Sequence, residues 1–224
     1  MLATEMSFIS IAGIPVAYDR GGSRIRPTFR CSRDFHASLT AWVHMFQAAS
    51  YRAGLGRIVL LVTAGFFVNK AGEHGRGNAG DLDLVVWEGG RECRPIRGDH
   101  ASLQQWRRRR YLGTEGTIRQ HFRWVLNGHY PNHADHFHFD TSGLPVRLSV
   151  GSKSDTLFIQ AVCNDFNGAE LVVDGVWGPK TRTAFDALLS ARSLRQLQPL
   201  ADPGDYKQFL RVVTHCGLTN RPIQ

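Results

Sequence analysis

The chain has 224 residues, and 27 Lys and Arg against 19 Asp and Glu give it a formal net charge of +8. Hydrophobic residues make up 42% of the sequence, which excludes wholesale disorder because such a chain can bury enough apolar surface to offset its ordering entropy. The longest apolar stretch, residues 58–68, is well short of the ~20 residues that span a bilayer, so we expect no transmembrane helix.

The predicted elements mix helices and strands along the chain. Apolar residues at helical spacing, closed by Gly54, predict a first helix, and a β-branched run predicts the strand that follows it. A Gly-rich stretch predicts an exposed loop, and alternation around Phe137 and Phe139 predicts a late strand. Helix 34–53, strand 57–63, loop 71–80, strand 82–87, helix 114–127 and strand 136–140 together predict an α+β fold.

A domain boundary is predicted near residue 145. Nine of the ten histidines precede it, and only His215 follows. We therefore expect two domains, 1–145 and 146–224, with the chemistry of the histidines in the first.

The basic surplus peaks at residues 107–110, which are four consecutive arginines. This run has no interleaved aromatic residues and no recognisable reading-helix motif, so it predicts a solvated basic turn of a helix. We expect no nucleic-acid partner. The charge would suit any polyanion, including the anionic polymers of bacterial walls.

The sequence leaves the location of the protein open. The N-terminal segment has no Lys or Arg ahead of its apolar part and no clear small-residue cleavage site, so we expect that a secretory signal is absent or was trimmed away. The four cysteines are even in number but show no CxxC pattern, so disulfides are permitted without being required.

The segment around His136 carries the densest cluster of chemically active side chains. On a strand, residues two apart point to the same face, so His136, His138 and Asp140 would share one face. Phe137 and Phe139 would then lie in the core behind them. A rigid element would thus present two imidazoles to one point in space.

His74 and Asp81 form a second candidate group. His74 lies in the Gly-rich stretch and Asp81 begins the next strand, so the loop can fold back and bring both side chains to a shared centre. Two imidazoles and a carboxylate make a three-ligand set that leaves a fourth position for water, which is typical of catalytic zinc. The two groups together predict a metal site.

These strings resemble a known family. Residues 73–81 (EHGRGNAGD) and 134–140 (ADHFHFD) are similar to the zinc motifs of the LAS metallopeptidases, the group of lysostaphin and the D-alanyl-D-alanine carboxypeptidases, with hedgehog-like folds. The bacterial extensin-like C-terminal domain is more similar still, and the likeness covers roughly residues 28–142. It implies a small antiparallel sheet and the zinc ligands His74, Asp81 and His138. Gly72 and Gly80 depart from the usual pattern.

The resemblance leaves two candidates for the catalytic base. Asp135 is favoured as the base with His136 assisting the oxyanion, and His136 as the base is the alternative. His133 is interpreted as a loop histidine, with a role behind the ligands as the other possibility. Arg76 lies in the ligand loop and is the candidate for binding a substrate carboxylate.

The second domain carries a turn that leads into a helix. Gly175 and Gly178 permit turn conformations, Pro179 suits the first helical turn, and helices are expected over 181–189 and 206–213. Residues 174–184 resemble the peptidoglycan-binding repeat, which implies a small all-α wall-binding domain. The residues carrying that likeness are Asp174, Gly175, Trp177, Gly178, Pro179 and Thr181.

The two resemblances point to one substrate. We expect a zinc-dependent peptidoglycan hydrolase, acting as a monomer, that cleaves an amide bond in the stem or cross-bridge peptide as a carboxypeptidase or endopeptidase. A phage endolysin released at lysis is one hypothesis for its source, with action in the periplasm or at the cell exterior. The alternative is a non-catalytic wall-binding protein whose metal site is structural or vestigial.

Overall fold

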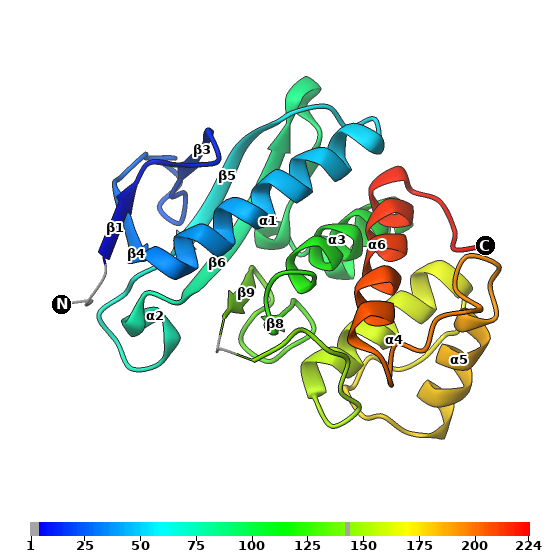
Figure 1. The fold of residues 1–224 in the computed structure, drawn as a ribbon. Coiled ribbons are helices and arrows are strands. Elements are labelled where there is room, and N and C mark those ends of the chain that lie inside the picture. The colour runs from blue at the N-terminus through cyan, green and yellow to red at the C-terminus, as the bar shows by residue number, and fades with distance from the viewer. Residues whose placement is uncertain (1–4, 142–143) are drawn as a thin grey trace.

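The computed structural model describes residues 5–141 and 144–224, and it has the mixed α+β character expected from the sequence (Figure 1). The strands are β1 (Glu5–Phe8), β2 (Ser10–Ile11), β3 (Ile14–Ala17), β4 (Phe29–Ser32), β5 (Ile58–Gly65), β6 (Ala79–Trp87), β7 (Glu92–Cys93), β8 (Trp124–Leu126) and β9 (Phe137–Asp140). The helices are α1 (Arg33–Arg52), α2 (Glu73–Arg76), α3 (Gln105–Arg119), α4 (Lys153–Asn167), α5 (Pro179–Leu189) and α6 (Pro203–Thr219).

The main sheet has the strand order β2-β3-β5-β6-β9-β8, with β7 on β6, and β1 pairs with β4 separately. Among the described pairs, β3 with β5 is parallel and the others are antiparallel. In the β6–β9 ladder, Asp81 lies opposite His138 and Gly80 opposite Phe139. The strands predicted over 57–63, 82–87 and 136–140 are confirmed as β5, β6 and β9.

Helix α1 covers one face of this sheet and confirms the helix predicted over 34–53 (Figure 1). Ser32 caps its first turn by accepting a hydrogen bond from Phe35 N at 3.2 Å. Trp42 lies at the centre of its buried face, 5.5 Å from the Phe139 ring, and its Nε1 donates to Thr117 at 3.0 Å. Full burial of each such aromatic side chain contributes about 2–3 kcal/mol of stabilisation.

The helix predicted over 114–127 is wrong in its extent. Helix α3 begins at Gln105 and ends at Arg119, and Trp124–Leu126 form β8, which pairs with β9. Thr114, at which the predicted helix would begin, is fully buried inside α3. Gly113 and Gly116 weaken helix propensity, and tertiary packing against α6 overrides that weakness.

Helices α3 and α6 lie side by side at very short range (Figure 1). A Cβ atom at Gly217 of α6 would lie 2.4 Å from the carbonyl oxygen of Arg109, and one at Gly113 of α3 would lie 2.9 Å from the amide nitrogen of Leu218. The closing helix predicted over 206–213 therefore exists, and it packs directly on the first predicted domain.

A buried ionic network also joins the two predicted domains. The guanidinium of Arg119 on α3 lies 2.8 Å from Glu115 and 2.9 Å from Asp155 on α4, and Arg123 lies 3.2 Å from the same aspartate. One hydrophobic core runs through both segments. The boundary near residue 145 stays a prediction, but the segments on either side of it share a core.

The run of four arginines is helical, as predicted, but it is not a solvated turn. Each of these side chains is only partly exposed. Arg108 pairs with Asp165 at 2.8 Å, and Arg109 donates to the backbone oxygen of Asp165 at 2.9 Å. Arg107 and Arg110 lie over the Trp106 ring. Two of the four arginines, Arg108 and Arg109, thus help to pack α3 against α4.

Two properties of the whole chain follow from this fold. Within residues 5–141 and 144–224, no helix is both long and apolar enough to span a membrane. The four cysteines are unpaired and buried, and burial raises the pKa of Cys31, Cys93 and Cys163 to about 12. None of these three is a reactive thiolate near neutral pH.

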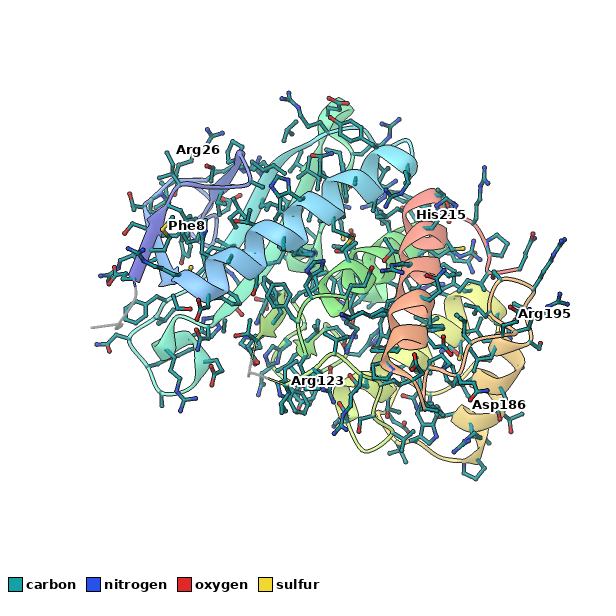
Figure 2. The ribbon with its side chains drawn as sticks, viewed as in Figure 1. Phe8, Arg26, Arg123, Asp186, Arg195 and His215 are labelled. Atoms are coloured by element: carbon teal, nitrogen blue, oxygen red, sulfur yellow. The ribbon has the colours of Figure 1, made fainter. Side chains whose placement is uncertain are left out.

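Exposed charges such as Asp186 and Arg195 project from the C-terminal helical unit (Figure 2).

Candidate metal centre

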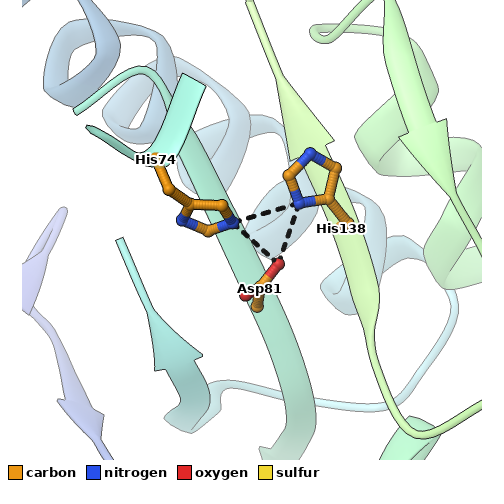
Figure 3. A group of neighbouring side chains, drawn as sticks. All are labelled: His74, Asp81 and His138. Atoms are coloured by element: carbon orange, nitrogen blue, oxygen red, sulfur yellow. Dashed lines mark hydrogen bonds and ion pairs between the residues drawn. The ribbon is translucent and has the colours of Figure 1, made fainter. Parts of the chain in front are cut away.

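Three side chains from distant parts of the sequence converge on one point (Figure 3). His74 Nε2 lies 3.2 Å from Asp81 Oδ1 and 3.1 Å from His138 Nδ1, and the latter two atoms are 3.0 Å apart. The sequence therefore identified three residues that do come together. This triad could hold a metal ion.

Local structure explains how each residue reaches the triad. Asp81 and His138 face each other on the paired strands β6 and β9. His74 comes from the short helix α2, where Gly75 is required because a Cβ there would lie 1.7 Å from the Lys70 carbonyl oxygen. The stretch 71–80 is thus not simply an exposed loop as predicted, because His74 is 4% exposed and the stretch ends inside β6.

The second nitrogen of each histidine is held by an oxygen of the protein. His74 Nδ1 lies 2.6 Å from the carbonyl oxygen of Phe66, and His138 Nε2 lies 3.5 Å from Asp140 Oδ2. A ring nitrogen that donates its proton there leaves the lone pair of the other nitrogen free for a metal. The free nitrogens are His74 Nε2 and His138 Nδ1, which are the two that converge.

The dimensions of the triad fit a tetrahedral ion. Zinc bound at ~2.0–2.1 Å by nitrogen and carboxylate oxygen would place its ligand atoms about 3.3 Å apart. The three observed separations, 3.0 to 3.2 Å, are slightly below that value. The residues present therefore suit a small divalent cation, and the side chains of His138 and Asp81 are partly exposed to solvent.

The charges of the triad are strongly coupled. Burial alone would raise the pKa of Asp81, but hydrogen bonds with His138 and His74 outweigh it and hold that pKa well below its usual range. Burial opposes the charge on His138, yet Asp140 and Asp81 raise its pKa to about 9. These contacts favour the protonated form of His138, so a metal ion would compete with that proton for the imidazole.

His136 and Asp135 stand beside the triad as a linked pair. The Nδ1 of His136 lies 2.6 Å from Asp135 Oδ1, and its Nε2 faces Asp81 Oδ1 at 3.8 Å. The second oxygen of Asp135 accepts a hydrogen bond from Arg20, which also binds Asp83 through two bonds of 2.8 and 2.9 Å. Both oxygens of Asp135 are thus occupied.

Arg20 and Asp83 were missed by the sequence analysis. Asp83 could have been identified from the sequence, because it is an acidic residue in an apolar strand. It lies two positions from Asp81 and therefore on the same face of that strand. No local pattern in the sequence indicated Arg20, since it follows β3 and lies 63 positions from Asp83. Only the fold brings it to the site.

The remaining predicted site residues lie around the triad. The ring of His133 is 4.9 Å from that of His136, and its Nδ1 lies 2.7 Å from the Pro131 carbonyl oxygen. The side chain of Arg76 is exposed and pairs with Glu73, so its role toward a substrate stays a prediction.

Gly80 is required by the packing of two aromatic rings behind the triad. A Cβ at this position would lie 3.0 Å from the Phe66 ring and 3.1 Å from Phe139. These two rings therefore occupy the space that a bulkier residue would need. This glycine affects packing behind the triad and leaves its three ligands unchanged.

Residues 174–181, which carry the second resemblance, form a turn organised by Gln160 of α4. The side chain of Gln160 donates to Asp174 at 2.9 Å and to Thr181 at 3.1 Å, and it accepts from Gly175 N at 2.9 Å. Gly175 has a φ of 77°, which favours glycine. Pro179 begins α5, and Gly178 is its N-cap. The ring of Trp177 packs on Phe185 at 5.6 Å.

A hollow of about 1090 Å³ borders this turn. It is lined by residues 169–172, by the turn itself and by α5, and Val172 and Val176 on its wall are strongly exposed. The motif residues Asp174, Gly178, Pro179 and Thr181 all contribute to its lining.

Comparisons with family models, with curated proteins and with solved structures find no match to this chain. The fold and the site together define an α+β protein with a candidate metal centre of two histidines and one aspartate. The likeness to the LAS and extensin-like families rests on the motif residues alone.

Proposed function

We propose that this chain is a zinc-dependent peptidoglycan hydrolase that cleaves an amide bond in the stem or cross-bridge peptide, as a carboxypeptidase or endopeptidase. One observation carries the proposal: His74 Nε2, Asp81 Oδ1 and His138 Nδ1 converge within 3.2 Å of one another. The motifs that resemble the LAS and extensin-like domains contain these same three residues.

The triad suits zinc in its donor types and in the separations of its ligand atoms. When bound there, zinc would polarise the substrate carbonyl and lower the pKa of water toward 7. Phe66 and Asp140 would hold the two ligand imidazoles in the orientation that zinc requires.

His136 is the better candidate for the general base. Asp135 was favoured from the sequence, but both of its oxygens accept hydrogen bonds, from His136 and Arg20. Burial is the largest single influence on Asp135 and opposes its charge, but these two partners together outweigh it and hold its pKa below the usual range. We therefore assign the proton transfer to His136 Nε2, which faces the triad, and assign to Asp135 the orientation of the imidazole.

His136 would accept the proton of the attacking water and pass it to the leaving amine. This role needs a neutral imidazole with its lone pair on Nε2, which is the tautomer that the contact between Nδ1 and Asp135 favours. His133 packs against the same ring and limits its movement.

The C-terminal segment would bind the wall. The turn organised by Gln160 and the hollow beside it offer polar and apolar groups to a glycan or peptide of the wall. Tethering would raise the local concentration of the enzyme at its substrate. An LAS-like fold for the first segment, a peptidoglycan-binding fold for the second and a phage endolysin as the setting are parts of this proposal.

Mass spectrometry of muropeptides after digestion tests the proposal. Purified protein with zinc should release new fragments, and chelator or His138→Ala should abolish them. The fragments would also identify the bond and distinguish a carboxypeptidase from an endopeptidase. Unchanged muropeptides with zinc, together with retained wall binding, would instead favour the non-catalytic wall-binding protein.

A further inference from the structure

Asp83 is a buried carboxylate behind the metal centre. Its side chain is completely shielded from solvent. A buried charge is retained only when a well-placed partner compensates for its lost hydration. Arg20 is that partner, since its Nε and Nη2 donate to the two oxygens of Asp83 at 2.9 and 2.8 Å. This bidentate pairing fixes the plane of the guanidinium and leaves Nη1 free.

The backbone around Arg20 is also fixed. Arg20 follows β3 in a turn where Tyr18 N donates to the Ile25 carbonyl oxygen at 2.9 Å. Within the turn, Asp19 accepts hydrogen bonds from Arg24 N at 3.1 Å and from Arg24 Nε at 3.2 Å. Both the main chain and the guanidinium of Arg20 are therefore held in place.

The free Nη1 of Arg20 donates to Oδ2 of Asp135. Asp135 is 47% exposed at its side chain and precedes β9, so its own surroundings would leave the carboxylate free to rotate. With Oδ2 held by Arg20, Oδ1 is presented to His136 Nδ1 at 2.6 Å. The four residues form one chain of contacts from the core to the edge of the triad.

We propose that Arg20, clamped by Asp83, is a positioning residue that holds Asp135 so that His136 keeps its Nδ1 proton and directs Nε2 at the metal centre. This inference rests on the proposed function, in which His136 is the base. Arg20 does not touch the ligands, and it acts through Asp135.

Arg20→Lys is the decisive variant. Lysine keeps a positive charge for Asp83, but a single ammonium lacks the planar fork that binds Asp83 twice and still reaches Asp135. The tautomer of His136 is read from long-range ¹H–¹⁵N correlation spectra of the zinc-saturated protein at about pH 8, above the ordinary pKa of imidazole. We expect the single Nδ1–H tautomer of the wild type to become a mixture. Turnover of muropeptides should fall about 10- to 100-fold while zinc still binds.

Arg26→Gln is the matched control. Arg26 is an exposed arginine in the same segment and is not among the residues that hold Arg20, so both the His136 spectrum and turnover should stay as in the wild type. The double variant Arg20→Gln with Asp83→Asn removes the buried charge together with its partner, and it replaces Arg20→Lys if that variant does not fold. It should give the same mixture of tautomers.

The outcomes separate this inference from the proposed function. A His136 spectrum that is unchanged in the Arg20 variants would overturn the role of Arg20, whether or not the protein cleaves muropeptides. If the wild type cleaves nothing, the proposed function fails, while the spectra still decide whether Arg20 positions the Asp135–His136 pair.

Discussion

Asp81 Oδ1 and His138 Nδ1 lie 3.0 Å apart because their residues face each other across the β6–β9 ladder. Two of the three candidate ligands are therefore placed by strand register, and only His74 depends on a separate segment. Such preorganisation reduces the loss of conformational entropy that metal binding would otherwise cause. The site should retain most of its geometry without an ion.

Substitution of the candidate ligands should abolish tight metal binding. His138→Ala or Asp81→Ala leaves two ligands, so we expect zinc affinity to fall at least 100-fold. Isothermal titration with zinc measures this loss. His44→Ala, which removes an exposed histidine of α1, is the control and should bind zinc like the wild type. Equal affinities in all three variants would place the metal elsewhere.

Stability of the metal-free protein should decrease from about pH 6.5 to pH 9. The pKa of His138 is raised from 6.5 to about 9 in the folded state, because its contacts with Asp140 and Asp81 outweigh burial. The folded state then binds a proton more tightly than the unfolded state, so this contribution is complete below the unfolded pKa and is lost as pH rises through the folded one.

The loss can be measured by urea unfolding in the presence of chelator. It should be no more than about 3 kcal/mol, since one pKa unit corresponds to ~1.4 kcal/mol. In His138→Gln the decrease over this pH range should be much smaller. An equal decrease in wild type and variant would assign it to other groups.

The close crossing of α3 and α6 should not tolerate a larger residue. Gly217→Ala places a methyl group 2.4 Å from a backbone oxygen, so we expect a loss of about 1–3 kcal/mol in the free energy of unfolding. Gly151→Ala is the control, since the nearest atom to its added Cβ is a serine hydroxyl at 3.9 Å. Denaturant titration of the two variants tests the prediction, and similar midpoints would contradict it.

The buried network of Arg119 should make the two predicted domains depend on each other. Asp155→Ala leaves Arg119 and Arg123 without this carboxylate, and we expect a destabilisation of about 3–5 kcal/mol. A fragment of residues 1–145 lacks α4 and α6 and should not fold alone. Circular dichroism and ¹H–¹⁵N spectra of that fragment measure this directly. A well-dispersed spectrum would instead support an independent first domain.

Salt should weaken binding to wall material. The net charge of +8 would attract anionic wall polymers, and the Debye length falls from ~10 Å at 0.1 M to ~3 Å at 1 M salt. Sedimentation with purified walls across this range should therefore leave more protein unbound at high salt. Binding that is independent of salt would show that the charge is not used for wall attachment.

Sequence patterns predicted most of the strands around the site but not all of the helices. Helix α1 and strand β9 were predicted from periodicity, which reports directly on one buried face. Strand β5 was predicted from its β-branched residues, and β6 was predicted as the strand that follows the Gly-rich stretch. Helix α3 was misplaced because its buried face contains Gly113 and Gly116. Glycine is needed at these two positions because α6 packs closely against them, which the local sequence does not reveal. The arginines of α3 were interpreted as solvated because their partners, such as Asp165, are distant in sequence.

By itself, the sequence identified candidate metal ligands, from residue types and from spacings of two and seven positions, and the resemblance to the LAS motifs implied the set His74, Asp81 and His138. The sequence also predicted which side chains of a strand share a face, because strand alternation is a local property. Only the tertiary structure decided the pair that orients the candidate base. Arg20 lies 63 positions from Asp83 and 115 from Asp135, and contacts over such separations follow from the packing of β3, β6 and β9 rather than from any local pattern.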